Sequence, residues 1–172
     1  MRDLKLPALY KGHPLFTLEE DFDEAREIRR MSGRIISATS AIDQVIAGII
    51  ADTIFREVKE YRELVFGSVL SSDWCSLAAK RKLLSIAVEQ FDLLSGSKKG
   101  ELEKSLKKVT QYRNAFAHGT LGHNVTVQEL HYFEGSPRRD ILDEPYFDEL
   151  ERHFLTAWTL LGEVQLSIKA TA

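Results

Sequence analysis

The chain has 172 residues, with 23 Lys and Arg against 26 Asp and Glu and a formal net charge of −3 at pH 7. Its hydrophobic content of 44% and charged content of 28% are ordinary for a globular protein with one substantial core. The slight excess of acidic residues counts against a general affinity for nucleic acid but does not exclude a local basic cleft. The lone Cys75 excludes an intramolecular disulfide and a cysteine-rich zinc site. Because the sequence has no secretory segment and no apolar run of about 20 residues, we expect a cytoplasmic protein with no membrane span.

The N-terminal segment, residues 1–16, carries two prolines and a glycine, and we expect it to be an irregular arm. A single helical domain is predicted over residues 17–172. Thr17 and Glu20 have the spacing of a capping box, in which each side chain bonds a free backbone N–H of the other residue. This spacing predicts that the first helix begins at Thr17.

The strongest helical pattern covers residues 35–55, where apolar side chains recur every three or four positions. We expect this helix to run on to Phe66 and to end at Gly67. Asp43 stands out within the apolar pattern. It is either a solvated or hydrogen-bonded polar residue, which is the more frequent case because buried carboxylates are rare unless paired, or an acidic residue beside a functional cleft.

A second helix is predicted over residues 74–93, with residues 71–73 as its cap. Lys80, Arg81 and Lys82 interrupt its apolar face. For at least two of the three, the simplest interpretation is a solvated face on which the aliphatic stems cover apolar surface. Lys80 is the exception, as a cation that could supply positive charge to a phosphate cleft.

A flexible linker rich in Gly, Ser and Lys is predicted at residues 94–100. A third helix follows over residues 101–118, with an apolar face that continues to Phe116. Gly119 comes directly after this pattern, and Gly is the usual residue just past a helix end. The stretch before Gly119 is therefore predicted to be the last turn and a half of the helix.

Strong polar chemistry enters this apolar pattern at Arg113, Asn114 and His118. The five positions from Arg113 to His118 correspond to about 140° around a helix and about 7.5 Å along it, so one helix spreads these groups over an arc. Ala115 and Ala117 are small, and we expect them to be exposed so that another helix can approach closely. A second copy of the helix, packed antiparallel, would bring two Arg and two His around one cleft.

After the third helix the period of the sequence changes. Residues 125–133 are β-branched and aromatic with rough alternation, and turn residues follow at 134–138. These features predict a small β-hairpin at about residues 125–143. A last helix is predicted over residues 146–168, with Pro145 at an early position.

The other histidines carry weaker signals. His13 and His153 are most simply surface residues. A metal site made of His118, His123 and His131 is disfavoured, because the loop and strand give no i, i+4 ligand pair and no carboxylate motif accompanies them. We therefore expect no metal and no cofactor.

The pattern of Arg113, Asn114 and His118 near the C-terminal end of a helix resembles the Arg-x(4–6)-His signature of the HEPN family. The form Arg-Asn-x-x-Ala-His-Gly is similar to the mannitol-operon-repressor-like branch and to other stand-alone HEPN proteins. Many members carry a Tyr two residues after the His, where this chain has Thr120. The resemblance covers roughly residues 20–120, and with the residue pattern it predicts an all-α bundle of four to five helices with a small appended β-hairpin.

The resemblance implies a metal-independent endoribonuclease of toxin, defence or RNA-processing type, acting in a cleft at a homodimer interface. Arg113 and His118 would be catalytic, the product would carry a 2′,3′-cyclic phosphate, and Asn114, Asp43 and Lys80 would support the site. RNA, a second copy and an antitoxin or regulatory protein are the partners implied. The alternative is a non-enzymatic helical module for partner binding or transcriptional regulation, in which Arg113 and His118 are structural; a bundle that binds a nucleotide or small ligand is a third hypothesis.

Overall fold

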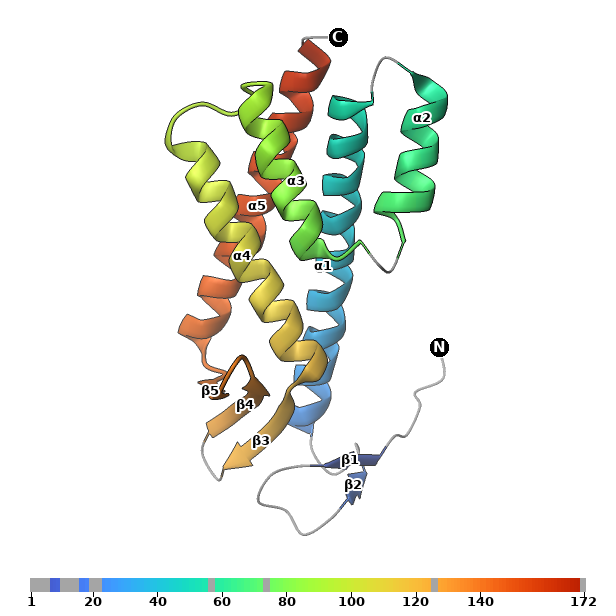
Figure 1. Ribbon diagram of the computed structural model, residues 1–172. Coiled ribbons are helices and arrows are strands. Elements are labelled where there is room, and N and C mark those ends of the chain that lie inside the picture. The colour runs from blue at the N-terminus through green and yellow to red at the C-terminus, as the bar shows by residue number, and fades with distance from the viewer. Residues whose placement is uncertain are drawn as a thin grey trace. The chain divides into compact units, whose positions relative to one another are not determined.

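The computed structural model describes residues 7–9, 16–18, 23–55, 58–72, 75–124 and 127–170. This part of the chain is mostly helical, with five α-helices, one π-helical segment and two small antiparallel sheets (Figure 1). The elements are β1 (Pro7–Leu9), β2 (Phe16–Leu18), α1 (Asp23–Ile54), α2 (Lys59–Leu64), η2 (Val65–Leu70), α3 (Leu77–Gln90), α4 (Ser97–His118), β3 (Thr120–Asn124), β4 (Val127–Phe133), β5 (Pro137–Ile141) and α5 (Glu144–Ala170). The prediction of a helical bundle with a small β element is confirmed.

The chain packs as two compact units. The sheet-containing unit comprises Met1–Ser37 and Gln111–Leu150, and the helical unit comprises Ala38–Thr110 and Glu151–Ala172. Helices α1, α4 and α5 each contribute residues to both units.

One apolar core holds the helical unit together. Most of its members come from α1, α3, α4 and α5, as the three- and four-residue spacing of apolar positions predicts, and η2 and the segments that flank α3 add Leu70, Cys75, Leu93 and Leu94. Removing one such side chain from water contributes about 1.5–3 kcal/mol. Apart from alanines, the side chains of this core with at most 1% exposure are Ile46, Ile49, Ile50, Leu70, Leu84, Val109, Leu161 and Val164.

The predicted continuation of the first helix to Phe66 is wrong. Helix α1 ends at Ile54, and α2 and the π-helical segment η2 follow, so that Gly67 lies inside a helical segment and ends none. The apolar residues that suggested a continuous buried face do not form one. Tyr61 is 61% exposed and Leu64 is 59% exposed. Val65 packs partly buried against the core, and Leu70 is the first fully buried residue of α2 and η2.

The predicted starts of the next two helices also shift. Helix α3 begins at Leu77, where Ser76 is the N-cap and its hydroxyl oxygen accepts the backbone N–H of Ala79 at 3.2 Å. Helix α4 begins at Ser97, inside the predicted linker, directly after Gly96 at φ +58°. The left-handed turn at Gly96 needs only one residue, so residues 97–100 remain free to extend the helix.

The N-terminal arm is not wholly irregular. Strands β1 and β2 pair antiparallel, with Ala8 opposite Thr17. The predicted helix start at Thr17 is therefore wrong, since Thr17 lies in a strand and α1 begins at Asp23. Glu20, the other member of the predicted capping box, lies outside the described residues.

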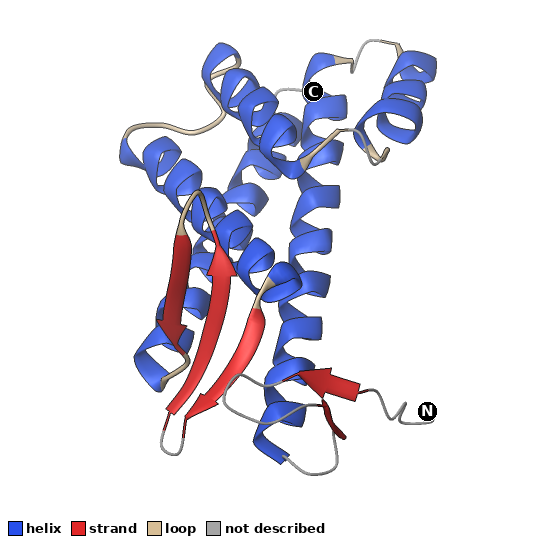
Figure 2. Ribbon diagram, turned by 60° about the horizontal axis from the view of Figure 1, so that its bottom comes forward, coloured by secondary structure: helices blue, strands red, loops and turns tan. Residues whose placement is uncertain are grey.

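A three-stranded antiparallel sheet replaces the predicted two-stranded hairpin, with strand order β3-β4-β5 (Figure 2). Strands β4 and β5 match the hairpin, and Gly135 at φ +68° lies in their turn. Strand β3 was not predicted; it begins at Thr120 and pairs with β4 from Thr120 opposite His131. Asp143 then caps α5, because its Oδ1 accepts the backbone N–H of Tyr146 at 2.9 Å.

Among the described helices, α1 contains one stretch, Arg29–Ile54, that is long and apolar enough to cross a membrane by length and composition alone. This signal is weak, because the core helix of a soluble protein has the same length and composition. Ile42, Ile46, Ala47, Ile49, Ile50 and Ala51 of that stretch belong to the apolar core of the helical unit.

Candidate functional site

The last two turns of α4 carry the polar residues that the sequence singled out. Arg113 is half-buried, whereas Asn114 and His118 are exposed. The Arg113 Nη1 donates a hydrogen bond to Asn114 Oδ1 at 3.1 Å. This hydrogen bond holds the adjacent side chains of Arg113 and Asn114 together. His118 lies at the final helical position, with its imidazole exposed to solvent.

The apolar side of the same turns anchors them. Phe116 is 7% exposed and Ala115 is 3% exposed, so the expected exposure of Ala115 is wrong, while Ala117 is exposed. Ala115 is buried because α4 presents it and Phe116 to the interior of the sheet-containing unit. Only Ala117 remains available to a second helix.

The residue directly after α4, Gly119, has to be a glycine for a steric reason. Its backbone N–H donates to the carbonyl oxygen of Ala115 at 2.7 Å. A Cβ at this position would overlap that same carbonyl oxygen and would lie 2.7 Å from Leu130 Cδ1 of β4. Its φ is not among the positive values in the described chain, so the need for Gly here is the close approach of backbone and strand, not a left-handed turn. This contact fixes where His118 and β3 lie relative to β4.

An aromatic cluster fixes the other side of the α4 end. Tyr112 and Tyr146 pack edge to face with ring centroids 5.6 Å apart, and Tyr146 makes the same contact with Phe147 at 5.6 Å. Phe116 lies 6.3 Å from Tyr146. Burial, with a smaller effect of the Asp140 carboxylate, raises the pKa of Tyr146, so its hydroxyl stays protonated. The aromatic cluster supports the end of α4 rigidly and supplies no general base.

A charged cluster on the small sheet was not predicted from the sequence. Glu129 is 7% exposed; its Oε2 lies 2.8 Å from His131 Nε2, and its Oε1 accepts a bond from Arg139. Burial raises the pKa of Glu129, but the hydrogen bonds from His131 and Arg139 outweigh it, so the pKa lies below the usual value. The signal in the sequence was the alternation of charged and apolar residues along β4. These residues form a cluster only through the register of β4 with β5, which places His131 opposite Arg139.

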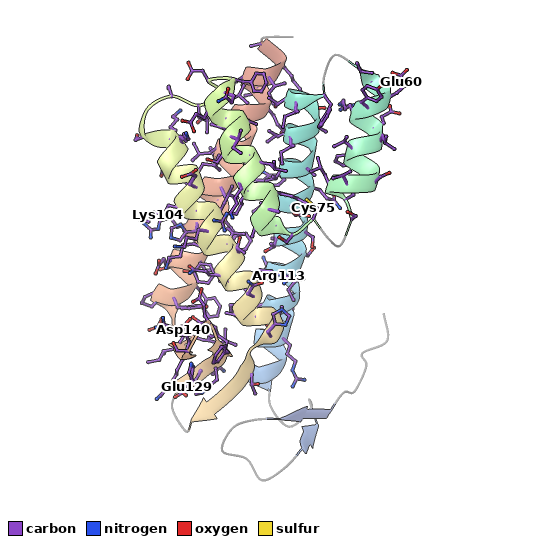
Figure 3. The ribbon with its side chains drawn as sticks, in the orientation of Figure 1. Glu60, Cys75, Lys104, Arg113, Glu129 and Asp140 are labelled. Atoms are coloured by element: carbon purple, nitrogen blue, oxygen red, sulfur yellow. The ribbon has the colours of Figure 1, made fainter. Side chains whose placement is uncertain are left out.

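A second pair crosses the same two strands. The Tyr132 hydroxyl donates to Asp140 Oδ2 at 3.0 Å. Burial and this hydrogen bond raise the pKa of Tyr132 to about 12, so it remains protonated at neutral pH. Glu129 and Asp140 are labelled in Figure 3, together with Arg113.

Asp43 and Lys80 form an ion pair in the helical unit. Lys80 Nζ lies 2.6 Å from Asp43 Oδ2, and Lys80 is 3% exposed. The structure thus brings Asp43 and Lys80 together in one unit and Arg113 and Asn114 together in the other. Because its ammonium is buried against a carboxylate, Lys80 has little charge left to offer a phosphate. Asp43 is therefore a hydrogen-bonded polar residue, as in the first of the two alternatives that the sequence left open.

His153 is not the surface residue that the sequence suggested. It is 5% exposed, and its Nδ1 lies 3.3 Å from the Ser105 hydroxyl, which is also buried. The helical pattern of α5 allowed either placement, because His153 lies three residues after Leu150 and four before Ala157, both buried. Among the described residues, no group of three His, Cys, Asp or Glu is placed to hold a metal ion.

Comparison with known proteins adds no assignment: no family model, no curated protein and no solved structure matches this chain. The chemistry of the candidate site therefore rests on the chain's own residues. An exposed imidazole can exchange a proton near neutral pH, and a guanidinium keeps its charge and matches phosphate oxygens in a planar fork. The end of α4 offers both groups on one rigid element.

Proposed function

We propose that this protein is a metal-independent endoribonuclease of the HEPN type, with Arg113 and His118 as its catalytic residues. The observation that supports this most is the geometry of the α4 end. Arg113 is half-buried and tied to Asn114 at 3.1 Å, while His118 is exposed on the last helical position. A held cation and a free imidazole on a rigid helix end are what phosphodiester transfer needs when no metal takes part.

The proposed reaction starts with His118, which takes the proton of a ribose 2′-hydroxyl. The 2′-oxygen then forms a bond to the adjacent phosphorus, and the bond from phosphorus to the 5′-oxygen of the next nucleotide breaks. That oxygen leaves with a proton from an imidazolium, which we assign to His118 of a second copy. The products are a 2′,3′-cyclic phosphate and a free 5′-hydroxyl, and the Arg113 guanidinium offsets the charge that builds up on the phosphoryl oxygens.

A second copy is needed because one helix separates the two groups. Arg113 and His118 lie about 140° apart around the α4 axis, so a single chain does not aim both at one phosphate. A two-fold dimer with residues 110–120 at its interface would supply both groups from opposite sides. Exposed Ala117 is small enough for a second α4 to approach closely. We place this dimer in the cytoplasm, in a toxin, defence or RNA-processing role.

The test compares the wild type with His118→Ala on a mixed RNA pool in EDTA, followed by analysis of the RNA ends. Arg138→Ala, which changes an exposed residue of β5, is the matched control, and thermal melts establish that all three proteins are folded. We expect the wild type and the control to produce 2′,3′-cyclic phosphate ends and His118→Ala to lose most of that activity. Equal cleavage by the wild type and His118→Ala, or cleavage by neither, would favour the partner-binding module.

A further inference from the structure

Helices α3 and α4 enclose a groove of about 760 Å³ in the helical unit. One wall runs over residues 81–88 of α3 and the other over residues 99–107 of α4. All of these residues belong to one compact unit, so the groove is a feature of that unit alone. None of the residues assigned to RNA cleavage lines it.

Positive charge concentrates along this groove, although the whole chain carries a net charge of −3. Among the described residues, five cationic side chains and a single carboxylate, that of Glu103, line it. Lys82, Lys104 and Lys107 are exposed and form no ion pair within the described part of the chain. Figure 3 labels Lys104 on α4. These three ammonium groups favour an acidic ligand.

The other two cations are already engaged within the protein. Lys99 Nζ lies 2.7 Å from Glu89 Oε2, and Arg81 Nη1 donates to the Thr110 hydroxyl at 3.3 Å. Arg81 is also the only arginine among the described residues that line the groove, and this hydrogen bond uses one of its five N–H donors. The three exposed cations are lysine ammonium groups, which bind carboxylates as well as phosphates.

Apolar surface lies between these charges. Leu84, Val88, Leu102 and Leu106 form the floor of the groove and are buried. Ile86 lines the α3 wall and is 56% exposed, and Leu83 on the same helix is 37% exposed. Exposed aliphatic side chains beside a groove favour an apolar partner surface.

We infer that the α3–α4 groove docks an amphipathic helix of another protein, whose apolar stripe contacts Ile86 and the groove floor and whose acidic flanks meet Lys82, Lys104 and Lys107. A cleft between two helices with an aliphatic floor and charged rims suits a helical ligand with anchors at positions i, i+3, i+4 and i+7. Single-stranded RNA fits less well, because none of the described residues that line the groove is aromatic and bases would have no ring on which to stack.

The test measures fluorescence anisotropy with a synthetic helical peptide that has Leu along one stripe and Glu elsewhere. A scrambled peptide of the same composition and a mixed-sequence single-stranded RNA are the comparison ligands. The groove variant is Lys104→Glu with Lys107→Glu. The matched control is Lys59→Glu with Lys169→Glu, which makes the same change in net charge at exposed positions that do not line the groove.

We expect the helical peptide to bind the wild type, to bind the groove variant at least about tenfold more weakly, and to bind the control within about twofold of the wild type. A third variant, Ile86→Asp, should also weaken binding of the helical peptide. This result would separate apolar docking from charge attraction alone. Equal binding of the scrambled peptide, equal weakening by the control, or no peptide binding would overturn the proposal. Tighter binding of the RNA that the groove variant abolishes would also overturn it. None of these outcomes depends on whether the protein cleaves RNA.

Discussion

Lys80 Nζ lies 2.6 Å from Asp43 Oδ2, and the two side chains are buried to very different extents, 4% exposed for Lys80 and 29% for Asp43. The Lys80 ammonium is almost wholly removed from water and depends on its carboxylate, whereas the Asp43 side chain keeps partial exposure, although its Oδ1 is buried. The pair links α1 to α3 within the helical unit. Its asymmetry leads to the first prediction.

Asp43→Ala should destabilise the protein more than Lys80→Met. The first change leaves a buried ammonium without its partner, which should cost about 3 kcal/mol or more, whereas the second leaves a carboxylate on a side chain that is 29% exposed and should cost less, about 1–2 kcal/mol. Urea unfolding of both variants measures the difference. Lys59→Ala, which breaks the exposed pair with Glu63 at 3.8 Å, is the control and should change stability very little. A larger loss for Lys80→Met would contradict this account.

Gly119→Ala should cost at least about 2 kcal/mol, because the new methyl group meets the Ala115 carbonyl oxygen and Leu130 Cδ1 and neither can move freely. Gly100→Ala, inside α4, is the matched control. A Cβ there meets nothing within 4 Å, and the change should stabilise α4 by about 0.5–1 kcal/mol. Thermal melts of both variants test the contrast. A neutral Gly119→Ala would mean that this turn has room that the structure does not show.

The proposed chemistry predicts a graded loss of RNA cleavage at the α4 end. Arg113→Ala should lower the rate about 10²–10⁴-fold, comparable to His118→Ala, and Arg113→Lys should restore only part of it because Lys lacks the planar fork. Asn114→Ala should cost less, about tenfold, by releasing the guanidinium that it holds. Initial rates at saturating RNA measure this order. Full activity of Arg113→Ala would remove Arg113 from the reaction.

The proposed dimer predicts a particle of about twice the 19.6 kDa chain mass in light scattering. Ala117→Glu should shift it to the monomer without lowering thermal stability, because two like charges would face each other across the two-fold axis while the single chain loses no buried contact. Ala79→Glu, at an exposed position of α3, is the control and should leave the mass unchanged. A monomeric wild type at high micromolar concentration would rule out the shared cleft.

The charged cluster on the sheet predicts a pH dependence. The pKa of Glu129 is depressed in the folded state, so its contribution to stability is present above the unfolded pKa, about 4.3, and is lost as the pH falls through the folded pKa. The Glu129→Gln variant should therefore lose stability less steeply than the wild type below about pH 5. Urea unfolding from pH 7 to pH 3 measures the slopes, with exposed Glu101→Gln as the control. Parallel curves for the wild type and Glu129→Gln would contradict this assignment.

The sequence alone determined four of the helices in outline and the end of the motif helix. Apolar residues repeating every three or four positions predicted α1 from residue 35, and α3, α4 and α5 in outline, and the Gly after His118 marked where α4 ends. These are local properties, because helical spacing and the backbone needs of a helix end are written within a few residues. Arg113, Asn114 and His118 were found for the same reason, as polar residues at one end of an apolar pattern.

Tertiary structure decided what depends on distant parts of the chain. The pairing of Thr120 with His131 created strand β3 and the close contact at Gly119, and packing buried His153 and Ala115, although local pattern allowed either placement. The tie of Lys80 to Asp43 and the cluster around Glu129 likewise join residues from different elements. Whether a polar group is buried depends on the hydrogen-bond partner that another element brings to it. Without such a partner, burying the group costs free energy that contacts with its neighbours in sequence do not offset.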